Sequence, residues 1–312
     1  MIAGIIGVIS PSGNEIGPFR SIEQAGLTQL VPDSQRTQTF AWYNLSGSFA
    51  TALGALTGRW LAQLLQINGV SALYSYRIIL MGYAVGGIVI FIFFLFTSDA
   101  LEIPTDQPVP TVKQTLGLHK SRGVVFRLSG LFAMDAFAGG LIVQSMMAYW
   151  FSIRFGISPG VIGSIYFGAN ILAGISALSA GWLGRKIGLI NTMVFTHIPS
   201  NLLLLLVPLL PSLPLPIGVL LMRFSISQMD VPTRQSYTMA LVDPNKHSAA
   251  SGVTTIARSF GAAFAPSLTG LFLSIPGLIS VPFYLCVGLK LIYDLGLYRS
   301  FRGFKPSEEL RT

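Results

Sequence analysis

The stretch IILMGYAVGGIVIFIFFLF, residues 78 to 96, carries no charged side chain at any position. A segment of about 20 mostly apolar residues is long enough to cross the hydrocarbon core of a bilayer as a helix. Its apolar residues also run on without the alternation that a membrane-spanning β-strand requires. The stretch therefore predicts an all-α membrane protein.

The composition of the whole chain agrees with this prediction. Of its 312 residues, 52% are hydrophobic and 10% are charged, whereas soluble domains contain about 25% charged residues. The formal net charge of +8 indicates basic loops at a membrane face rather than a nucleic-acid partner. The single cysteine, Cys286, excludes a disulfide within the chain. No metalloprotease, serine hydrolase or P-loop motif occurs, so we expect neither an enzyme nor a cofactor or metal site.

Candidate membrane spans can be counted along the chain. Segment 98–126, with three prolines and mixed charge, reads as a solvated linker. If it is cytoplasmic, and if residues 2–31 also cross the membrane, Lys and Arg gather on the cytoplasmic side together with the C-terminus. Residues 2–31 are a ninth candidate, interrupted by the charged stretch SPSGNEIGPFRSIEQAG from residue 10. The eight clear candidates are 39–64, 74–97, 128–152, 158–183, 189–211, 213–240, 248–274 and 278–297.

Two distant segments of the chain resemble each other, which indicates an internal duplication. The copies are separated by six candidate spans, so a complete chain would have twelve. Nine are present if residues 2–31 form a span, and we therefore expect three spans to be missing before Met1. The matches are Ile6-Gly7-Val8 with Ile217-Gly218-Val219, Leu30-Val31 with Leu241-Val242, and Ser48-Phe49 with Ser259-Phe260, all 211 residues apart.

A short basic loop adds a family resemblance. GWLGRKIG, residues 181 to 188, lies between two candidate spans and is similar to the glycine-rich basic loop of the major facilitator superfamily. Gly181, Gly184, Lys186 and Gly188 fit that pattern, whereas Arg185 stands where the family often has an acid. With the repeat and the linker, the chain resembles a transporter of this superfamily that lacks the first three transmembrane helices.

The resemblance implies a bundle of about nine transmembrane helices. Residues 1–97 would be the last three helices of the first half, 98–126 a cytoplasmic linker, 127–298 a complete six-helix second half and 299–312 a cytoplasmic tail. It further implies a monomeric, multi-pass protein of the lipid bilayer, in a plasma or bacterial inner membrane. A small-molecule or ion substrate, with protons as a candidate coupling ion, would be its partner.

Ionisable residues inside spans are costly and usually face a bundle interior or an aqueous cavity. The resemblance implies that spans 2–31, 128–152 and 213–240 line such a cavity. Their charged residues are the candidate substrate or proton pathway: Glu15, Arg20, Glu23, Asp135, Arg223, Asp230 and Arg234. Candidates for gating or interface contacts are Arg258, Gly181, Gly184, Arg185, Lys186 and Gly188.

The spacing of these charges suggests how they pair. Arg20 with Glu23, and Asp230 with Arg234, are three and four residues apart and share a helix face. Such pairs either contact substrate and protons or only latch helices together. Asp135 has no partner in its own span, and we expect Arg258 to pair across the two halves. Three further expectations are that Lys290 and Asp294 form a structural pair, that His197 is a packing residue, and that Pro18 and Pro232 interrupt their helices.

The function that these observations favour is secondary active transport of a small solute, as in a drug or metabolite permease, by alternating access. Both an anion bound by Arg223 or Arg234 and a cation bound by the carboxylates remain open. The alternative is a non-transporting or inactive truncated membrane protein with a structural or regulatory role.

Overall fold

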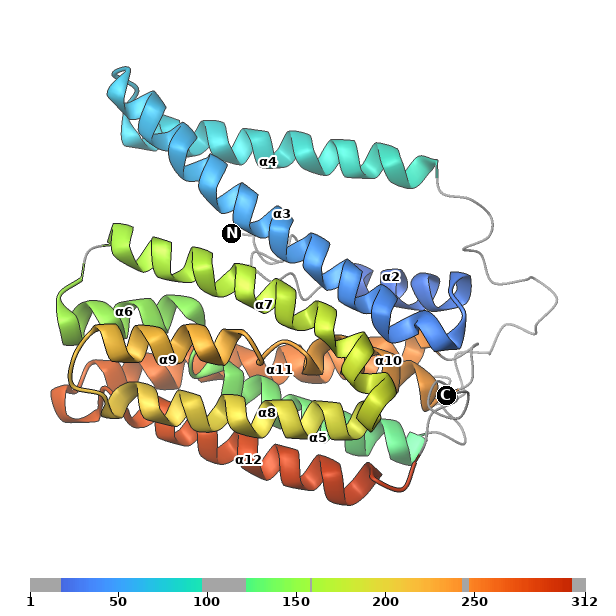
Figure 1. The fold of residues 1–312 in the computed structure, drawn as a ribbon. Helices are drawn as coiled ribbons and strands as arrows, with labels where there is room; N and C mark the ends of the chain where they lie inside the picture. Colours follow the sequence, from blue (N-terminus) through green and yellow to red (C-terminus); the bar gives the residue numbers. More distant parts are fainter. Residues whose placement is uncertain (1–17, 97–121, 158, 243–246, 305–312) are drawn as a thin grey trace. The chain divides into compact units, whose positions relative to one another are not determined.

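The computed structural model describes residues 18–96, 122–157, 159–242 and 247–304, and the regular structure in these segments is helical (Figure 1). This confirms the all-α fold class expected from the sequence. The α-helices are α2 (Pro18–Leu30), α3 (Arg36–Ile67), α4 (Ala72–Leu95), α5 (Arg122–Gly140), α6 (Gln144–Phe155), α7 (Pro159–Ile187), α8 (Leu189–Leu206), α9 (Pro214–Phe224), α10 (Asp230–Ala240), α11 (His247–Leu273) and α12 (Val281–Phe301).

The chain forms two compact units. The smaller unit is Ser46–Pro108 and the larger combines Met1–Leu45 with Val109–Thr312. In the smaller unit, the end of α3 is joined to α4 by a tight turn in which Gly69 has a φ of +84°. α4 contains most of the charge-free stretch, and Ser75 is its buried residue. The domain boundaries expected from the sequence stay a prediction.

Six helical segments are long and apolar enough to cross a membrane, judged by length and composition within the described residues. They agree with six of the candidate spans: 74–97, 128–152, 158–183, 189–211, 248–274 and 278–297. Candidate 39–64 lies within the long helix α3. Candidate 2–31 falls partly outside the described residues, and its C-terminal part is α2.

Two candidate spans are interrupted helices. Span 128–152 is divided into α5 and α6 at residues 141–143, and span 213–240 into α9 and α10 at residues 225–229 (Figure 1). The helix interruption that we expected at Pro232 therefore lies just before it, at residues 225–229. Pro232 itself lies in the first turn of α10, where its missing N–H removes no helical hydrogen bond.

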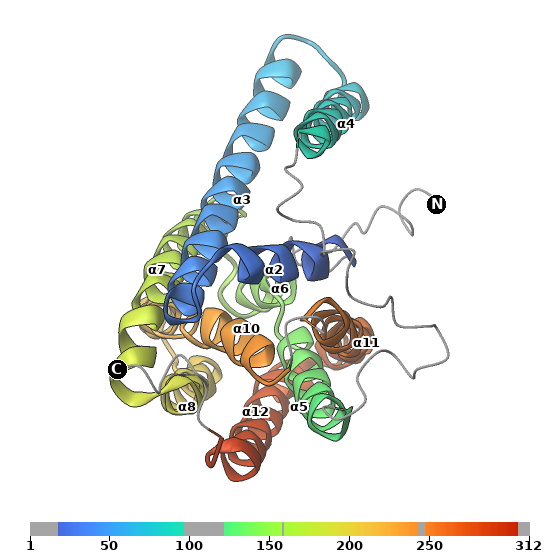
Figure 2. The same cartoon turned by 90° about the vertical axis from the view of Figure 1, so that its right-hand side faces the viewer.

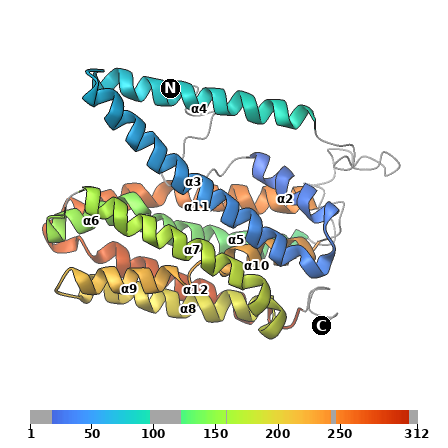
Figure 3. The same ribbon diagram turned by 45° about the horizontal axis from the view of Figure 1, so that its top comes forward.

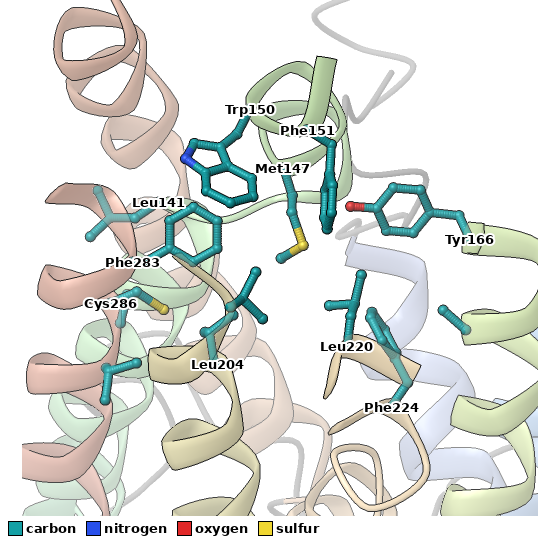
Figure 4. Close-up of a cluster of buried hydrophobic side chains, with 14 of the residues drawn as sticks. Leu141, Met147, Trp150, Phe151, Tyr166, Leu204, Leu220, Phe224, Phe283 and Cys286 are labelled. Carbon is teal, nitrogen blue, oxygen red and sulfur yellow. The ribbon is translucent and has the colours of Figure 1, made fainter. Parts of the chain in front are cut away.

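The larger unit contains two principal clusters of buried apolar side chains. The first, which we call the α6 cluster, surrounds Trp150 and Phe151 and includes Leu204, Leu220 and Phe283 (Figure 4). The second, the α8 cluster, includes Leu128, Phe132, Met193, Tyr293 and Leu297. Because α5, α8 and α12 each contribute to both clusters, the two form successive apolar layers along these helices.

Helices α5 and α11 lie side by side and approach each other closely (Figure 3). A Cβ atom added to Gly261 of α11 would lie 2.1 Å from the carbonyl oxygen of Ala133. One added to Gly140 of α5 would lie 2.7 Å from Cβ of Ala265. The two backbones can approach this closely only because glycine has no side chain.

Helix α10 occupies the interior of the larger unit. Viewed along the bundle, it has α7, α8, α11 and α2 among its neighbours (Figure 2). Most of its residues are buried, including Asp230, Arg234, Gln235 and Thr238. The sequence DVPTRQSYTMA thus forms a polar helix that is enclosed by other helices.

Candidate functional site

A layer of charged side chains lies between the two apolar clusters. On α5, Asp135 comes after Phe132 of the α8 cluster and before Leu141 of the α6 cluster. On α8, His197 likewise comes between Met193 and Leu204. Five helices contribute to this layer, whose ionisable members are Asp135, His197, Asp230, Arg234, Arg258, Lys290 and Asp294. We call it the charge layer.

Asp135 is the centre of this layer and is 4% exposed. Lys290 Nζ donates to its Oδ1 at 2.7 Å. Arg258 and Arg234 both donate to its Oδ2, at 3.0 and 3.2 Å. Asp135 therefore has partners on α10, α11 and α12, although none of them is near it in the sequence.

Asp230 and Arg234 form the pair that their spacing predicted, with Arg234 Nη1 3.0 Å from Asp230 Oδ2. The same nitrogen also contacts Asp135, so Arg234 joins two carboxylates on different helices. Its guanidinium carbon lies 5.5 Å from the centre of the Phe132 ring, within range of a cation–π contact. The pair is thus one part of a larger network.

His197 lies between the two residues that were expected to pair with each other. Its Nδ1 is 2.7 Å from Asp294 Oδ1, and its Nε2 is 3.3 Å from Lys290 Nζ. Asn201, one turn along α8, donates to the other oxygen of Asp294 at 3.2 Å. The expected Lys290–Asp294 pair is therefore bridged by an imidazole, and His197 belongs to the charged network.

These contacts favour one tautomer of a neutral His197 ring. A lysine ammonium group only donates hydrogen bonds, so the Nε2 atom facing Lys290 is an acceptor. The hydrogen of the neutral ring then lies on Nδ1 and is donated to Asp294. Asp294, His197, Lys290 and Asp135 consequently form a continuous chain of hydrogen bonds across α12, α8 and α5.

The charge layer is electrically balanced when His197 is neutral. Its carboxylates are Asp135, Asp230 and Asp294, and its cations are Arg234, Arg258 and Lys290. Removing one partner from a buried ion pair typically costs about 3–5 kcal/mol, because the other charge is left uncompensated. Loss of any one charged member of the layer is therefore expected to destabilise the folded protein.

Arg258 has a different partner from the one expected. The ion pair that the structure describes joins it to Asp135, which lies with it in residues 127–298. The sequence led us to expect a partner in the first half. Its side chain is also more exposed than that of Arg234, at 29% against 10%.

The charged residues of span 2–31 can be placed only in part. Glu23, on α2, accepts a hydrogen bond from the Tyr43 hydroxyl of α3. Arg20 is on α2, but its side chain is outside what the structure describes, as is the whole of Glu15. The expected Arg20–Glu23 pair therefore stays a prediction.

Arg223 is not part of the charge layer. It is in the last turn of α9, immediately before the interruption at residues 225–229. Its Nε atom is buried without a hydrogen-bond partner, and no ion pair is found for it among the described residues. Its guanidinium carbon lies 5.3 Å from the centre of the Phe224 ring.

A family model described as Major Facilitator Superfamily matches residues 16–266, which is most of the chain. The chain belongs to the major facilitator superfamily. An uncharacterized membrane protein of Saccharomyces cerevisiae, YJR124C, is 27% identical over 300 residues, an alignment that covers 87% of this chain and 67% of the yeast protein. The family is one of membrane transporters, as the sequence resemblance implied, and the chain is an integral membrane protein. The expected lack of three helices stays a prediction.

In this superfamily member, the glycine-rich segment 181–188 is not the loop that the sequence suggested, because α7 continues to Ile187 and only Gly188 lies between the two helices. Gly188 joins α7 to α8 as a single residue with a φ of +90°, which glycine adopts without strain. A Cβ atom on Gly181 would lie 2.1 Å from Gln38 Oε1 of α3, and one on Gly184 would lie 3.0 Å from Leu189 Cδ2. Arg185 and Lys186 are exposed. The last turns of α7 therefore pack closely against α3 and α8 while their two bases are exposed.

Polar contacts also connect α2 with α11. Ser251 donates to Gln24 Oε1 at 2.8 Å, and Thr28 Oγ1 lies 3.1 Å from His247 Nδ1. Burial lowers the pKa of His247 from its ordinary value, and the nearby charge of Arg36 lowers this pKa further. His247 lies before the apolar span of α11, which begins at Ala249.

Several members of the charge layer were not predicted as site residues, namely His197, Asn201, Lys290 and Asp294. One signal was present in the sequence. His197 and Asn201 are one helical turn apart in one candidate span, as are Lys290 and Asp294 in another. Two polar pairs at the same spacing in different spans could have indicated faces that meet.

Proposed function

We propose that this chain is a secondary active transporter that moves a small solute by alternating access, with protons as the coupling ion. The observation that carries the proposal is the charge layer. Replacing a buried ion network by apolar residues is often neutral or stabilising. Ionisable groups that are kept within membrane spans instead mark substrate or ion pathways.

Asp135 is the group through which a proton would act. Its two oxygens accept hydrogen bonds from Lys290, Arg258 and Arg234, which come from three different helices. Three cations around one carboxylate favour its ionised form, so Asp135 would take up a proton only in a second state in which some of these partners have moved away. A proton would thereby stabilise the state in which α5 is less firmly attached to the other helices, which is the two-state bias that alternating access requires.

This coupling can be tested with the full chain in proteoliposomes that contain a trapped pH dye. Benzoate, benzylamine and glucose serve as an anionic, a cationic and a neutral probe. We expect one of them to cause proton movement and to accumulate under an imposed pH gradient. Asp135→Asn should abolish accumulation but retain exchange of labelled for unlabelled solute, because exchange needs no net proton transfer.

The control variant is Asp33→Asn, which removes a carboxylate paired with Arg36 near the start of α3 and away from the charge layer. It should leave accumulation unchanged, and Asp135→Glu should restore part of it. If Asp135→Asn accumulates solute as well as the unchanged protein does, the coupling role is wrong. If the unchanged protein accumulates none of these probes, and none of a wider set of small solutes, the proposal of transport is contradicted.

We also propose that the α7–α8 loop and the C-terminus face the cytoplasm of the cell, because basic loops of membrane proteins favour that side. The single cysteine, Cys286, is buried, so a new surface cysteine can be labelled selectively. In Arg185→Cys, an impermeant maleimide should react only after the cells are permeabilised. In Ser212→Cys, which lies between α8 and α9, it should react with intact cells. The reverse pattern would overturn this orientation.

A further inference from the structure

Arg223 is a cation that makes no ion pair in the part of the chain that the structure describes, and its Nε atom is buried without a hydrogen-bond partner. The carboxylates there are engaged elsewhere: Glu23 by Tyr43, Asp33 by Arg36, Asp230 by Arg234, Asp135 by three cations and Asp294 by His197 and Asn201. Since the charge layer is balanced without Arg223, its charge is a surplus of one. The Arg223 side chain is partly buried, and a charge that is taken out of water without a partner is costly.

Arg223 lies far along the chain from the start of its helix. It is nine residues after Pro214, where α9 begins, or about 14 Å along a helix that rises 1.5 Å per residue. If α9 begins at the membrane surface, this distance is about half of the roughly 30 Å thickness of the hydrocarbon core. A charge at that depth needs a partner nearby or contact with an aqueous cavity between the helices.

Two hydroxyl groups near Arg223 also lack partners. The hydroxyl of Tyr166 is buried without a hydrogen bond, and this residue packs in the α6 cluster with Leu220 and Phe224, which flank Arg223 on α9. Figure 4 shows this hydroxyl pointing from α7 into the cluster. Ser227, four residues after Arg223 and within the helix interruption, is 6% exposed, and its hydroxyl is also unpartnered.

We infer that Arg223, Tyr166 and Ser227 bind the carboxylate of a small, singly charged organic anion whose apolar part packs against the α6 cluster. One guanidinium compensates one negative charge, and its planar geometry matches a carboxylate. The two hydroxyl groups supply further donors, and Phe224 and Phe151 offer apolar surface. A cationic solute has no free acceptor in this region, because each described carboxylate is already engaged.

This inference names the substrate class of the proposed transporter, and only the statement that the anion is moved depends on that function. Binding can be measured alone. In detergent, a maleimide dye that becomes fluorescent on reaction with the buried Cys286 reports unfolding of the full chain. Benzoate should raise the unfolding temperature, whereas benzylamine, benzyl alcohol and chloride at equal ionic strength should not.

The variants separate the site from general stability. Arg223→Gln should weaken the effect of benzoate by about tenfold or more, which corresponds to the loss of one charge-assisted hydrogen bond. Without benzoate, this variant should unfold at the same or a higher temperature, because an uncompensated charge has been removed. Tyr166→Phe should weaken benzoate binding a few-fold without lowering the unfolding temperature. The matched control is Arg154→Gln, an exposed arginine that stacks on Trp150.

Each outcome has one meaning. Stabilisation by chloride alone would replace the organic carboxylate with an inorganic anion and overturn the inference, as would stabilisation by benzylamine. Destabilisation of Arg223→Gln without ligand would show that the arginine already has a partner in the protein. Binding of benzoate that depends on Arg223 but is not followed by uptake would leave this inference standing and count against transport. Uptake of a cationic probe that is unaffected by Arg223→Gln would support transport and count against this inference.

Discussion

Helices α4 and α10 reverse the usual relation between polarity and burial. α4 is apolar on all sides, and the most apolar part of it is entirely exposed within the unit that contains it. α10 begins with Asp230 and, after two intervening residues, continues with Thr233, Arg234, Gln235 and Ser236. All five side chains are buried. In a soluble protein the apolar helix would be the enclosed one.

The difference shows which interactions hold this membrane protein together. Lipid tails are as apolar as leucine, so burying α4 against protein would gain little beyond packing. Polar side chains, in contrast, have no water to bind in the hydrocarbon region and must find partners on other helices. Thus α10 contributes Arg234 to the charge layer and Gln235 to a 2.7 Å hydrogen bond with Asn44 of α3.

The largest effect that would distinguish these regions is expected at Asp135. Asp135→Ala leaves three buried or partly buried cations without their shared acceptor, and should lower the free energy of unfolding by about 3–5 kcal/mol. Phe91→Leu, an exposed apolar change in α4, should alter it by less than about 0.5 kcal/mol. Denaturant titration in detergent, followed through the reactivity of Cys286, measures both. Equal effects would show that the charge layer adds nothing to stability.

A smaller effect is expected from a single methyl group. Gly261→Ala places Cβ against the Ala133 carbonyl of α5, and the resulting overpacking should cost about 1–3 kcal/mol. Gly87→Ala in α4 meets no atom within 4 Å, and should stabilise the helix by up to about 1 kcal/mol. The same assay compares them. If both substitutions changed the free energy of unfolding in the same direction, the close approach of α5 and α11 would be contradicted.

The smallest effect concerns pH. Because the pKa of His247 is lowered in the folded protein, the folded state takes up a proton less readily than the unfolded state. This residue therefore favours folding above its ordinary pKa of 6.5, and that contribution is lost as the pH falls below it. The unfolding temperature should decrease between about pH 7.5 and 5.5.

The comparison variant for this prediction is His247→Gln, which keeps a polar group near Thr28 but cannot be protonated. Its unfolding temperature should depend less on pH over the same interval. An equal decrease in both proteins would assign the pH dependence to other groups.

The sequence predicted well what local patterns determine. Apolar runs predicted six helical segments that are long enough to cross a membrane. The four-residue spacing of Asp230 and Arg234 predicted their ion pair, and GWLGRKIG predicted the tight turn at Gly188. Each of these depends on residues that are neighbours along one helix or one loop. The helix interruption near Pro232 was also anticipated, although not its position.

The partners of Asp135 could not be predicted from spacing. They are 99, 123 and 155 residues away in the sequence, and which faces of α10, α11 and α12 turn toward α5 depends on how the helices cross. The same holds for His197, whose bridge between Lys290 and Asp294 requires α8 to lie beside α12. For this reason Arg258 was assigned a partner in the first half.

The close approach of α5 and α11 has a mechanical consequence. Gly261 meets Ala133, which is two residues before Asp135, and Arg258 is three residues before Gly261. A contact between two backbones cannot yield by a change of side-chain rotamer, so α5 and α11 would pivot about it when one helix tilts against the other. Atoms close to the pivot point are displaced least. Asp135 and Arg258 therefore lie beside the point about which α5 and α11 would tilt, where the distance between the two helices changes least.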